Sequence, residues 1–190
     1  TDPMRFLDYL RGQTLTAHYR DEAYWSDIKV TDVDRLLKPK LPLYPVKIVL
    51  TALHRQQVVV IDYRKKDTEP GSVTVRPISP NHLVFADNRY HIRAYCHHKN
   101  YHLDFVLSRI VRAEIAEETE WVSSREDREW NKTVDLLLKP NPGLHESVQE
   151  AILRNYDGSE SGCRKIRCRK ALAFYIKRRL TGTNDPKYGK

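Results

Sequence analysis

Polar and apolar side chains alternate along the segment Asn88 to Cys96, NRYHIRAYC, with the two-residue period of a β-strand. One face of this strand carries Tyr90, Ile92, Ala94 and Cys96, and we expect that face to be core. The opposite face carries Arg89, His91, Arg93 and Tyr95. Their guanidinium, imidazole and phenol groups make the opposite face either a recognition surface for an anion or a nucleotide, or an ordinary solvated sheet face.

A helix and a series of strands are predicted around this segment. Pro45 can serve as the first residue of a helix in which Val46, Val49, Leu50 and Leu53 recur at i, i+3, i+4 and i+7. From Val58 to Ile115 the pattern becomes that of five or six short strands about ten residues apart, with turns at Asp87-Asn88 and at His97 to Asn100. This spacing predicts a small antiparallel β-barrel or sandwich.

Strand and helix patterns alternate again from residue 130 onward. We expect strands at Thr133 to Leu138 and at Cys163 to Cys168, a helix with Leu144, Val148 and Ile152 on one face, and a terminal helix with Leu172, Tyr175, Ile176 and Leu180 on one side. The predicted organisation is α+β. It comprises a connector with short strands at 1–44, a barrel domain at 45–116, an acidic linker at 117–129, a small α/β domain at 130–182 and a tail at 183–190.

Composition narrows the class of protein. The chain has 33 Lys and Arg against 25 Asp and Glu, and a formal net charge of +8 favours a polyanionic partner. The longest aliphatic run, Val58 to Ile61, is too short to cross a membrane, and the first residues lack an apolar export segment. The three cysteines include no CxxC pair, which argues against a disulfide framework and a zinc ribbon. We therefore expect a cytoplasmic protein with no membrane partner.

The middle of the chain resembles the WYL domain, a small Sm-like or SH3-like antiparallel β-barrel found in bacterial transcription factors. The residues that carry the resemblance are VVVIDY ending at Tyr63, Arg76 in RPISP, Leu83, YHIRAYC, and DFVLSRI from Asp104 to Ile110. Tyr90, His91 and Ile92 stand at the three positions that give the family its name.

Residues from Trp130 onward resemble the WCX extension that follows the WYL domain in regulators of phage-defence operons of the BREX and CBASS type. The segments WNKTVDLLLKPNPGL and RKALAFYIKRRL carry this second resemblance. It implies a homodimeric transcriptional regulator, expected to be a repressor, whose first part senses a ligand and whose second part dimerises. Such regulators read operator DNA with a winged helix, for which residues 1–44 are too short and too strand-like. We therefore expect the effector part of a regulator, with the winged helix absent from this chain.

A ligand site is predicted on one polar side of the barrel. Its five residues are Tyr63, Arg76, His91, Arg93 and Arg109. Arginine offers a planar fork for phosphate oxygens, and Tyr or His can stack on a base, so a nucleotide or a nucleic-acid end is the expected ligand. Parity places Arg76 opposite the Val73 and Val75 face and Arg93 opposite the Ile92 face, whereas parity cannot place Arg109.

Other chemistry is less well supported by the sequence. Cys96, His97, His98 and His102 lie close enough along the chain to be weighed as metal ligands, but adjacent ligands across a tight turn do not easily form a tetrahedron. We expect Cys96 to be a buried small hydrophobe and expect no metal. The sequence has no nucleophile elbow or glycine-rich phosphate loop, so we expect neither an enzyme nor a cofactor.

A group of basic residues lies near the C-terminus: Arg164, Lys165, Arg167, Arg169 and Lys170. Three interpretations stay open, namely a nucleic-acid contact, a solvated face, or an intersubunit contact with the acidic stretch Glu114 to Glu129. The alternative to a regulator is a stand-alone accessory module that binds nucleic acid through the barrel. A winged helix encoded upstream would distinguish the two.

Overall fold

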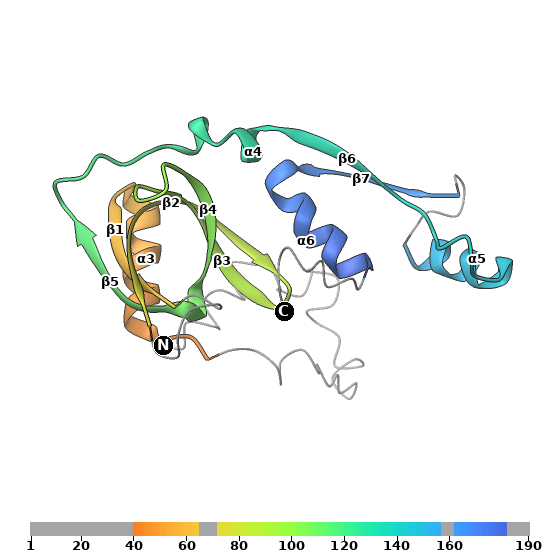
Figure 1. Ribbon diagram of the computed structural model, residues 1–190, viewed down its shortest axis with the longest axis horizontal. Helices are drawn as coiled ribbons and strands as arrows, with labels where there is room; N and C mark the ends of the chain where they lie inside the picture. The colour runs from red at the N-terminus through yellow and green to blue at the C-terminus, as the bar shows by residue number, and fades with distance from the viewer. Residues whose placement is uncertain (1–39, 65–71, 157–161, 182–190) are drawn as a thin grey trace, which may run out of the picture. The chain divides into compact units, whose positions relative to one another are not determined.

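The computed structural model describes residues 40–64, 72–156 and 162–181 (Figure 1). The chain divides into two compact units, residues 1–124 and 125–190, which are described separately below. The connector strands predicted before residue 40 and the tail at 183–190 lie outside the described residues.

One helix and an antiparallel sheet make up the described part of the first unit. The elements are α3 (Leu43–Arg55), β1 (Val58–Tyr63), β2 (Thr74–Ala86), β3 (Arg89–Cys96), β4 (Tyr101–Val106), the 3-10 helix η3 (Leu107–Arg109) and β5 (Ile110–Ala116). The strands lie in the order β4-β3-β2-β1-β5. The edge strands β4 and β5 do not pair with each other, so the predicted barrel is not closed and the sheet is open.

The open sheet is nevertheless curled, because η3 joins its two edge strands with only three residues (Figure 1). In a flat sheet, four strand spacings would separate these edges by about 19 Å. Three residues of 3-10 helix rise only about 6 Å. The end of the sheet nearest η3 is fixed by two hydrogen bonds, from the Val106 amide to the Tyr63 hydroxyl at 3.1 Å and from the Arg64 amide to the Arg109 carbonyl at 3.0 Å.

Helix α3 packs on β5, β2 and β1 and supplies the other wall of the core. As its spacing predicted, Val46 and Val49 are fully buried, while Leu50 and Leu53 are partly buried against the same core. The helix begins two residues before Pro45 rather than at it, and ends at Arg55; its C-cap Gln56 has a left-handed φ of 54°.

A single strand of thirteen residues, β2, replaces the two short strands expected around Arg76 and Leu83. Its first part pairs with β1 and its second part, from Ile78 onward, with β3. The Pro77 carbonyl accepts a hydrogen bond from the His97 amide at 3.0 Å, so it points away from β1. The nitrogen of a strand residue points to the same side as its carbonyl, so the Pro77 nitrogen points away from β1 as well. Pro80 lies beyond the β1 pairing and beside a register shift. Neither proline therefore removes a bond from the ladder with β1.

Strand β3 confirms the predicted core face and corrects the prediction for the other face. Tyr90, Ile92, Ala94 and Cys96 are each no more than 2% exposed, and Cys96 is the buried thiol that was expected. The alternative of a solvated opposite face is wrong for the centre of the strand, because His91 is 6% and Arg93 is 7% exposed.

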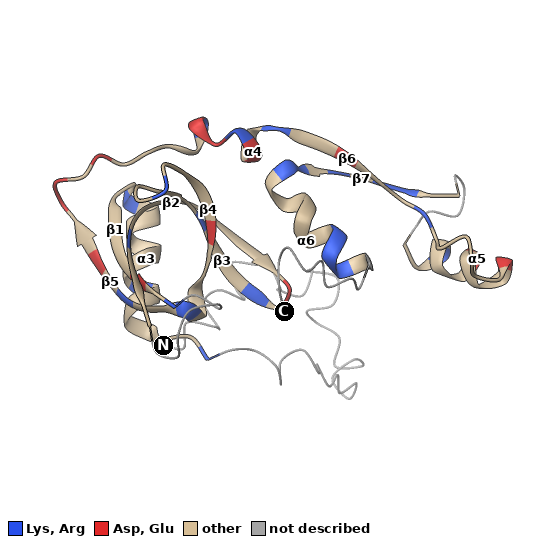
Figure 2. Ribbon diagram, viewed as in Figure 1, with Lys and Arg blue, Asp and Glu red and all other residues tan. Residues whose placement is uncertain are grey.

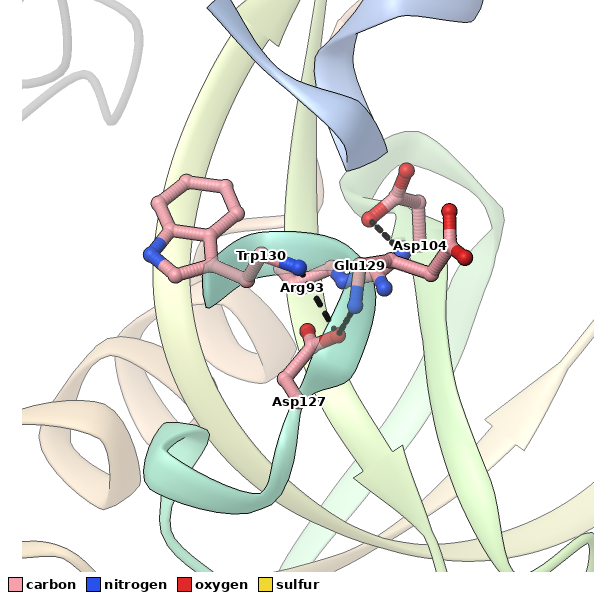
Figure 3. A network of polar contacts seen from close by, with 5 residues as sticks. All are labelled: Arg93, Asp104, Asp127, Glu129 and Trp130. Atoms are coloured by element: carbon pink, nitrogen blue, oxygen red, sulfur yellow. Dashed lines mark hydrogen bonds and ion pairs between the residues drawn. The ribbon is translucent and has the colours of Figure 1, made fainter. Parts of the chain in front are cut away.

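The described part of the second unit is a two-stranded antiparallel sheet with three α-helices. Its elements are α4 (Arg128–Asn131), β6 (Thr133–Leu138), α5 (Glu146–Asn155), β7 (Arg164–Arg169) and α6 (Lys170–Thr181), after the 3-10 helix η4 (Ser124–Glu126) at the unit boundary. These elements confirm the strands and helices predicted for this region. Asp127 caps α4 by accepting the amides of Glu129 and Trp130, each at 3.1 Å (Figure 3). None of the described helices is long and apolar enough to cross a membrane.

The turn between β2 and β3 gives a test of this fold. Asp87 and Asn88 have φ values of 50° and 57°, the left-handed pair that a two-residue hairpin turn needs. Asn88→Gly should raise the free energy of unfolding, and Asn88→Ala should lower it by roughly 1 kcal/mol, because a Cβ is strained at positive φ. Urea denaturation of both variants measures the difference, and equal stability of the two would contradict the turn geometry.

Candidate functional site

The first candidate site lies where β1 ends and β2 begins. Tyr63 pairs with Thr74 there, and Ile61 pairs with Arg76. Arg76 is only 7% exposed, and its Nε donates to the Thr74 hydroxyl at 3.3 Å. The Thr74 hydroxyl in turn donates to the Tyr63 carbonyl at 3.3 Å. These contacts hold the Arg76 guanidinium from one side only.

One nitrogen of the Arg76 guanidinium is left without a hydrogen bond in the part of the chain that the structure describes. Its buried Nη1 has no hydrogen-bond partner, and no carboxylate among the described residues pairs with Arg76. An unsatisfied buried donor costs about 1–3 kcal/mol, and a buried charge without a counter-charge is also unfavourable. An anion could accept from this side of the guanidinium and would remove both penalties.

Tyr63 and Arg109 lie at the same end of the sheet. The Tyr63 ring meets Phe105 edge-on at a centroid distance of 5.1 Å, and its hydroxyl holds the end of β4 as described above. Arg109 directly precedes Ile110, which pairs with Tyr63. The half-buried Arg109 side chain makes no hydrogen bond or ion pair within the part of the chain that the structure describes. We call Tyr63, Thr74, Arg76 and Arg109 the Arg76 site.

His91 and Arg93 lie on the other face of the sheet. Arg93 pairs with Asp104 of β4, and its Nη1 is 3.4 Å from the Asp104 carboxylate, with side chains 9% and 17% exposed (Figure 3). The charge of Arg93 is therefore already opposed by a carboxylate. His91 lies two residues away along β3, on the same face as Arg93.

A β-bulge separates Arg76 from Arg93. Cys96 pairs with Ile78, whereas Arg93 pairs with His82, so β2 contains one extra residue between these pairs. Arg76 therefore shares the core side with Ile61 and Ile78, while Val75, expected on an apolar face, is 58% exposed. The structure brings Tyr63, Arg76 and Arg109 to one end of the sheet and places His91 and Arg93 on the opposite face.

Two polar contacts of the sheet were not predicted. The first is the ion pair between Arg93 and Asp104. A tight turn at His97 to Asn100 places these two residues opposite each other, so the predicted turn contained the signal for this pair. The fully buried Ser79 accepts the Val122 amide at 3.0 Å and lies 2.9 Å from His97 Nε2. Burial lowers the pKa of His97, so the neutral imidazole is favoured.

The C-terminal basic group lies on β7 and at the start of α6, where its residues are blue in Figure 2. Most of its members have polar partners within their own unit. Lys165 and Arg167 both contact Asp135 at 2.9 Å, and these hydrogen bonds lower the pKa of the Asp135 carboxyl. Arg169 donates to the Trp130 carbonyl at 2.7 Å, and its guanidinium lies over the Trp130 ring.

Lys170 contacts Glu129 at 2.5 Å, so Glu129 of the acidic stretch has a partner in the same chain. Arg164 lies on the half-buried side of β7.

Two protein families match the two units. The WYL domain family matches residues 46–115, and the family described as BrxR transcriptional regulator, C-terminal dimerization domain, matches residues 133–188. The chain belongs to the WYL-domain proteins that carry this C-terminal domain.

The curated relatives of the chain include the DNA-binding transcriptional repressor CapW from three organisms. The CapW of Stenotrophomonas maltophilia is 32% identical over 135 residues, which are 71% of this chain and 44% of the relative. That of Pseudomonas aeruginosa is 32% identical over 142 residues (74% and 46%), and that of Escherichia coli 33% over 147 residues (77% and 48%). The chain thus spans just under half the length of these repressors.

A solved structure, the proteasome accessory factor B/C (PafBC) of Arthrobacter aurescens, matches 75% of this chain and 24% of its own, with 18% identity and a TM-score of 0.39. A score this low does not establish a shared overall fold.

The buried His91 gives a prediction for pH dependence. Burial lowers its pKa below the usual 6.5 against an opposing contribution from Asp104, so the unfolded chain binds this proton more readily than the folded chain. The free energy of unfolding should therefore fall as the pH falls through about 6.5. In His91→Asn the loss of stability between about pH 7.5 and pH 5 should be smaller than in the parent chain. The exposed His54→Asn is the control and should follow the parent; a steeper loss in His91→Asn would refute the assignment.

Proposed function

We propose that this chain is the ligand-sensing and dimerisation region of a transcriptional repressor that controls a phage-defence operon in the bacterial cytoplasm. The two family matches and the CapW relatives support the regulatory class. The regulator acts as a homodimer, and its operator DNA is read by a winged helix that lies outside this sequence. We propose that the sheet is an Sm-like sheet left open between β4 and β5, which its strand order and the short η3 connection support.

The observation that carries the ligand proposal is the buried Arg76 guanidinium. It is almost fully removed from water, one of its nitrogens lacks a partner, and no described carboxylate neutralises it. A structural arginine at such burial normally has a counter-charge, as Arg93 has in Asp104. The Arg76 site therefore suits an anion, and a phosphate group matches the fork of the guanidinium.

The surroundings of Arg76 favour a phosphate that is part of a larger ligand. Arg109 supplies a second guanidinium without a described partner, and the exposed Arg64 follows Tyr63 at the same end of the sheet. Tyr63 adds an aromatic ring next to these cations. We therefore propose a nucleotide or a nucleic-acid end as the ligand, bound through Arg76 and Arg109. His91 and Arg93 lie on the other face and do not contact this ligand directly in the proposal.

Ligand binding would act on DNA by changing how the two subunits of the dimer are disposed. Any ligand that binds one arrangement more tightly shifts the population toward it, and the spacing of the DNA-reading helices changes with it. The basic group Arg164, Lys165, Arg167, Arg169 and Lys170 is a further candidate for a nucleic-acid or dimer contact. Asp135 and Glu129 already pair with three of these residues. We therefore expect this basic group to contribute less to nucleic-acid binding than the Arg76 site does.

Replacing Arg76 separates stability from binding. Arg76→Met fills a similar volume without a charge, so it should keep or raise the free energy of unfolding without ligand, by up to about 1–3 kcal/mol. The same variant should weaken binding of ATP, inorganic phosphate or a short single-stranded DNA by about tenfold or more, because the phosphate loses its fork. Thermal unfolding with and without each compound, together with calorimetric titration, measures both effects.

The exposed Arg55 at the end of α3 provides the matched control. Arg55→Met removes the same charge and should leave the affinity for each compound unchanged. Equal affinities of the parent chain and Arg76→Met, or no binding of any of these compounds by the parent, would refute the Arg76 site. Strong binding of single-stranded DNA that depends equally on Arg55 would favour the accessory-module alternative.

A further inference from the structure

The second unit has no hydrophobic core of its own among the residues that the structure describes. Every buried hydrophobic side chain of the described chain lies between Leu41 and Ala113, in the first unit. In the described residues of the second unit, only Asp127 is buried. Burial of apolar surface is the main force that stabilises a fold, so this unit needs apolar contacts from outside it.

Helix α5 carries the clearest unmatched apolar surface of this unit. Leu144, Val148, Ile152 and Tyr156 follow one another at intervals of four residues, which places them in one ridge along the helix and its two ends. Leu144, Val148 and Tyr156 are 39%, 44% and 50% exposed. We call these four residues the α5 ridge.

Among the described elements of the unit, none covers the α5 ridge. Helix α6 packs on β6 and β7, whereas α5 makes no comparable contact with any described helix or strand, and Figure 1 shows it beyond the far end of β6, apart from α6. A ten-residue helix is marginal in water without tertiary contacts. The charged residues of α5, which are Glu146, Glu150 and Arg154, lie on the side of the helix opposite the ridge by helical spacing. No formal charge of α5 therefore opposes packing of this ridge on an apolar surface.

We propose that the α5 ridge packs against a second copy of this chain and forms the apolar centre of the dimer interface. This proposal rests on the proposed function, since it assigns the surface through which the dimer forms. The dimerization-domain family matches residues 133–188, which include all of α5, and this favours a second copy over a different partner. Specific interfaces bury about 800 Å² on each partner, so four side chains supply the centre of the interface and their surroundings supply the rest.

A charge placed on the ridge tests this assignment. Glutamate favours helix more than valine does, so Val148→Glu should keep α5 helical while it puts an unpaired charge into both halves of a symmetric interface. The dimer dissociation constant measured by sedimentation should rise at least about a hundredfold. Ser147→Glu adds the same side chain one position along, off the ridge by about 100°, and should change the constant less than about threefold.

Hydrogen exchange of the unmodified chain provides a measurement that needs no variant. The amides of residues 146–155 should exchange more slowly above the dimer dissociation constant than below it. If Val148→Glu dimerises with unchanged affinity, the ridge assignment is overturned and the proposed function stands. The same follows if the parent chain dimerises but the exchange of its α5 amides does not depend on concentration. A parent chain that is monomeric at all concentrations would overturn both.

Discussion

The three-residue connection between β4 and β5 is the constraint on which the first unit depends. It joins the two outer strands of a five-stranded sheet, so the sheet has to curl until its edges approach each other at that end. The curl brings the end of β4 to the end of β1, where the Tyr63 hydroxyl accepts the Val106 amide and the Arg64 amide donates to the Arg109 carbonyl. Arg76 and Arg109 lie near this junction because β2 and β5 both pair with β1.

Arg76 and Arg93 show how the partner strand decides what a buried arginine does. Both are 7% exposed and both lie within central strands. Arg93 stands opposite Asp104, so its ion pair is completed by the sheet itself. Arg76 stands opposite Ile61, and within the described residues its guanidinium donates only to the Thr74 hydroxyl. The same residue type at the same burial is thus a structural ion pair in one place and an unsatisfied donor in the other.

Local pattern predicted much of this fold, and long-range register decided the site. The alternation in β3, the helical spacing in α3 and the left-handed turn at Asn88 depend on neighbouring residues, so the sequence alone revealed them. The prediction grouped Arg76 with Arg93 because it took Val73 and Val75 as a core face. The strand register instead exposes Val75 and turns Arg76 to the core side with Ile61 and Ile78. The extra residue between Ile78 and His82, which puts Arg93 on the other face, is a long-range feature that the local pattern does not predict. The family resemblance identified the class of protein because it depends on motifs rather than on register.

The same physical argument underlies both proposals. A buried cation without a counter-charge and an apolar ridge without a cover each raise the free energy of the isolated chain, and each is relieved by a specific kind of partner. Natural proteins keep such features where function requires the partner, because a structure optimised only for stability would neutralise or bury them. In the two proposals, an anion stabilises the first unit and a second copy of the chain stabilises the second unit, by the same principle. If the two units of each subunit are coupled, ligand binding at the sheet and association through α5 affect each other reciprocally.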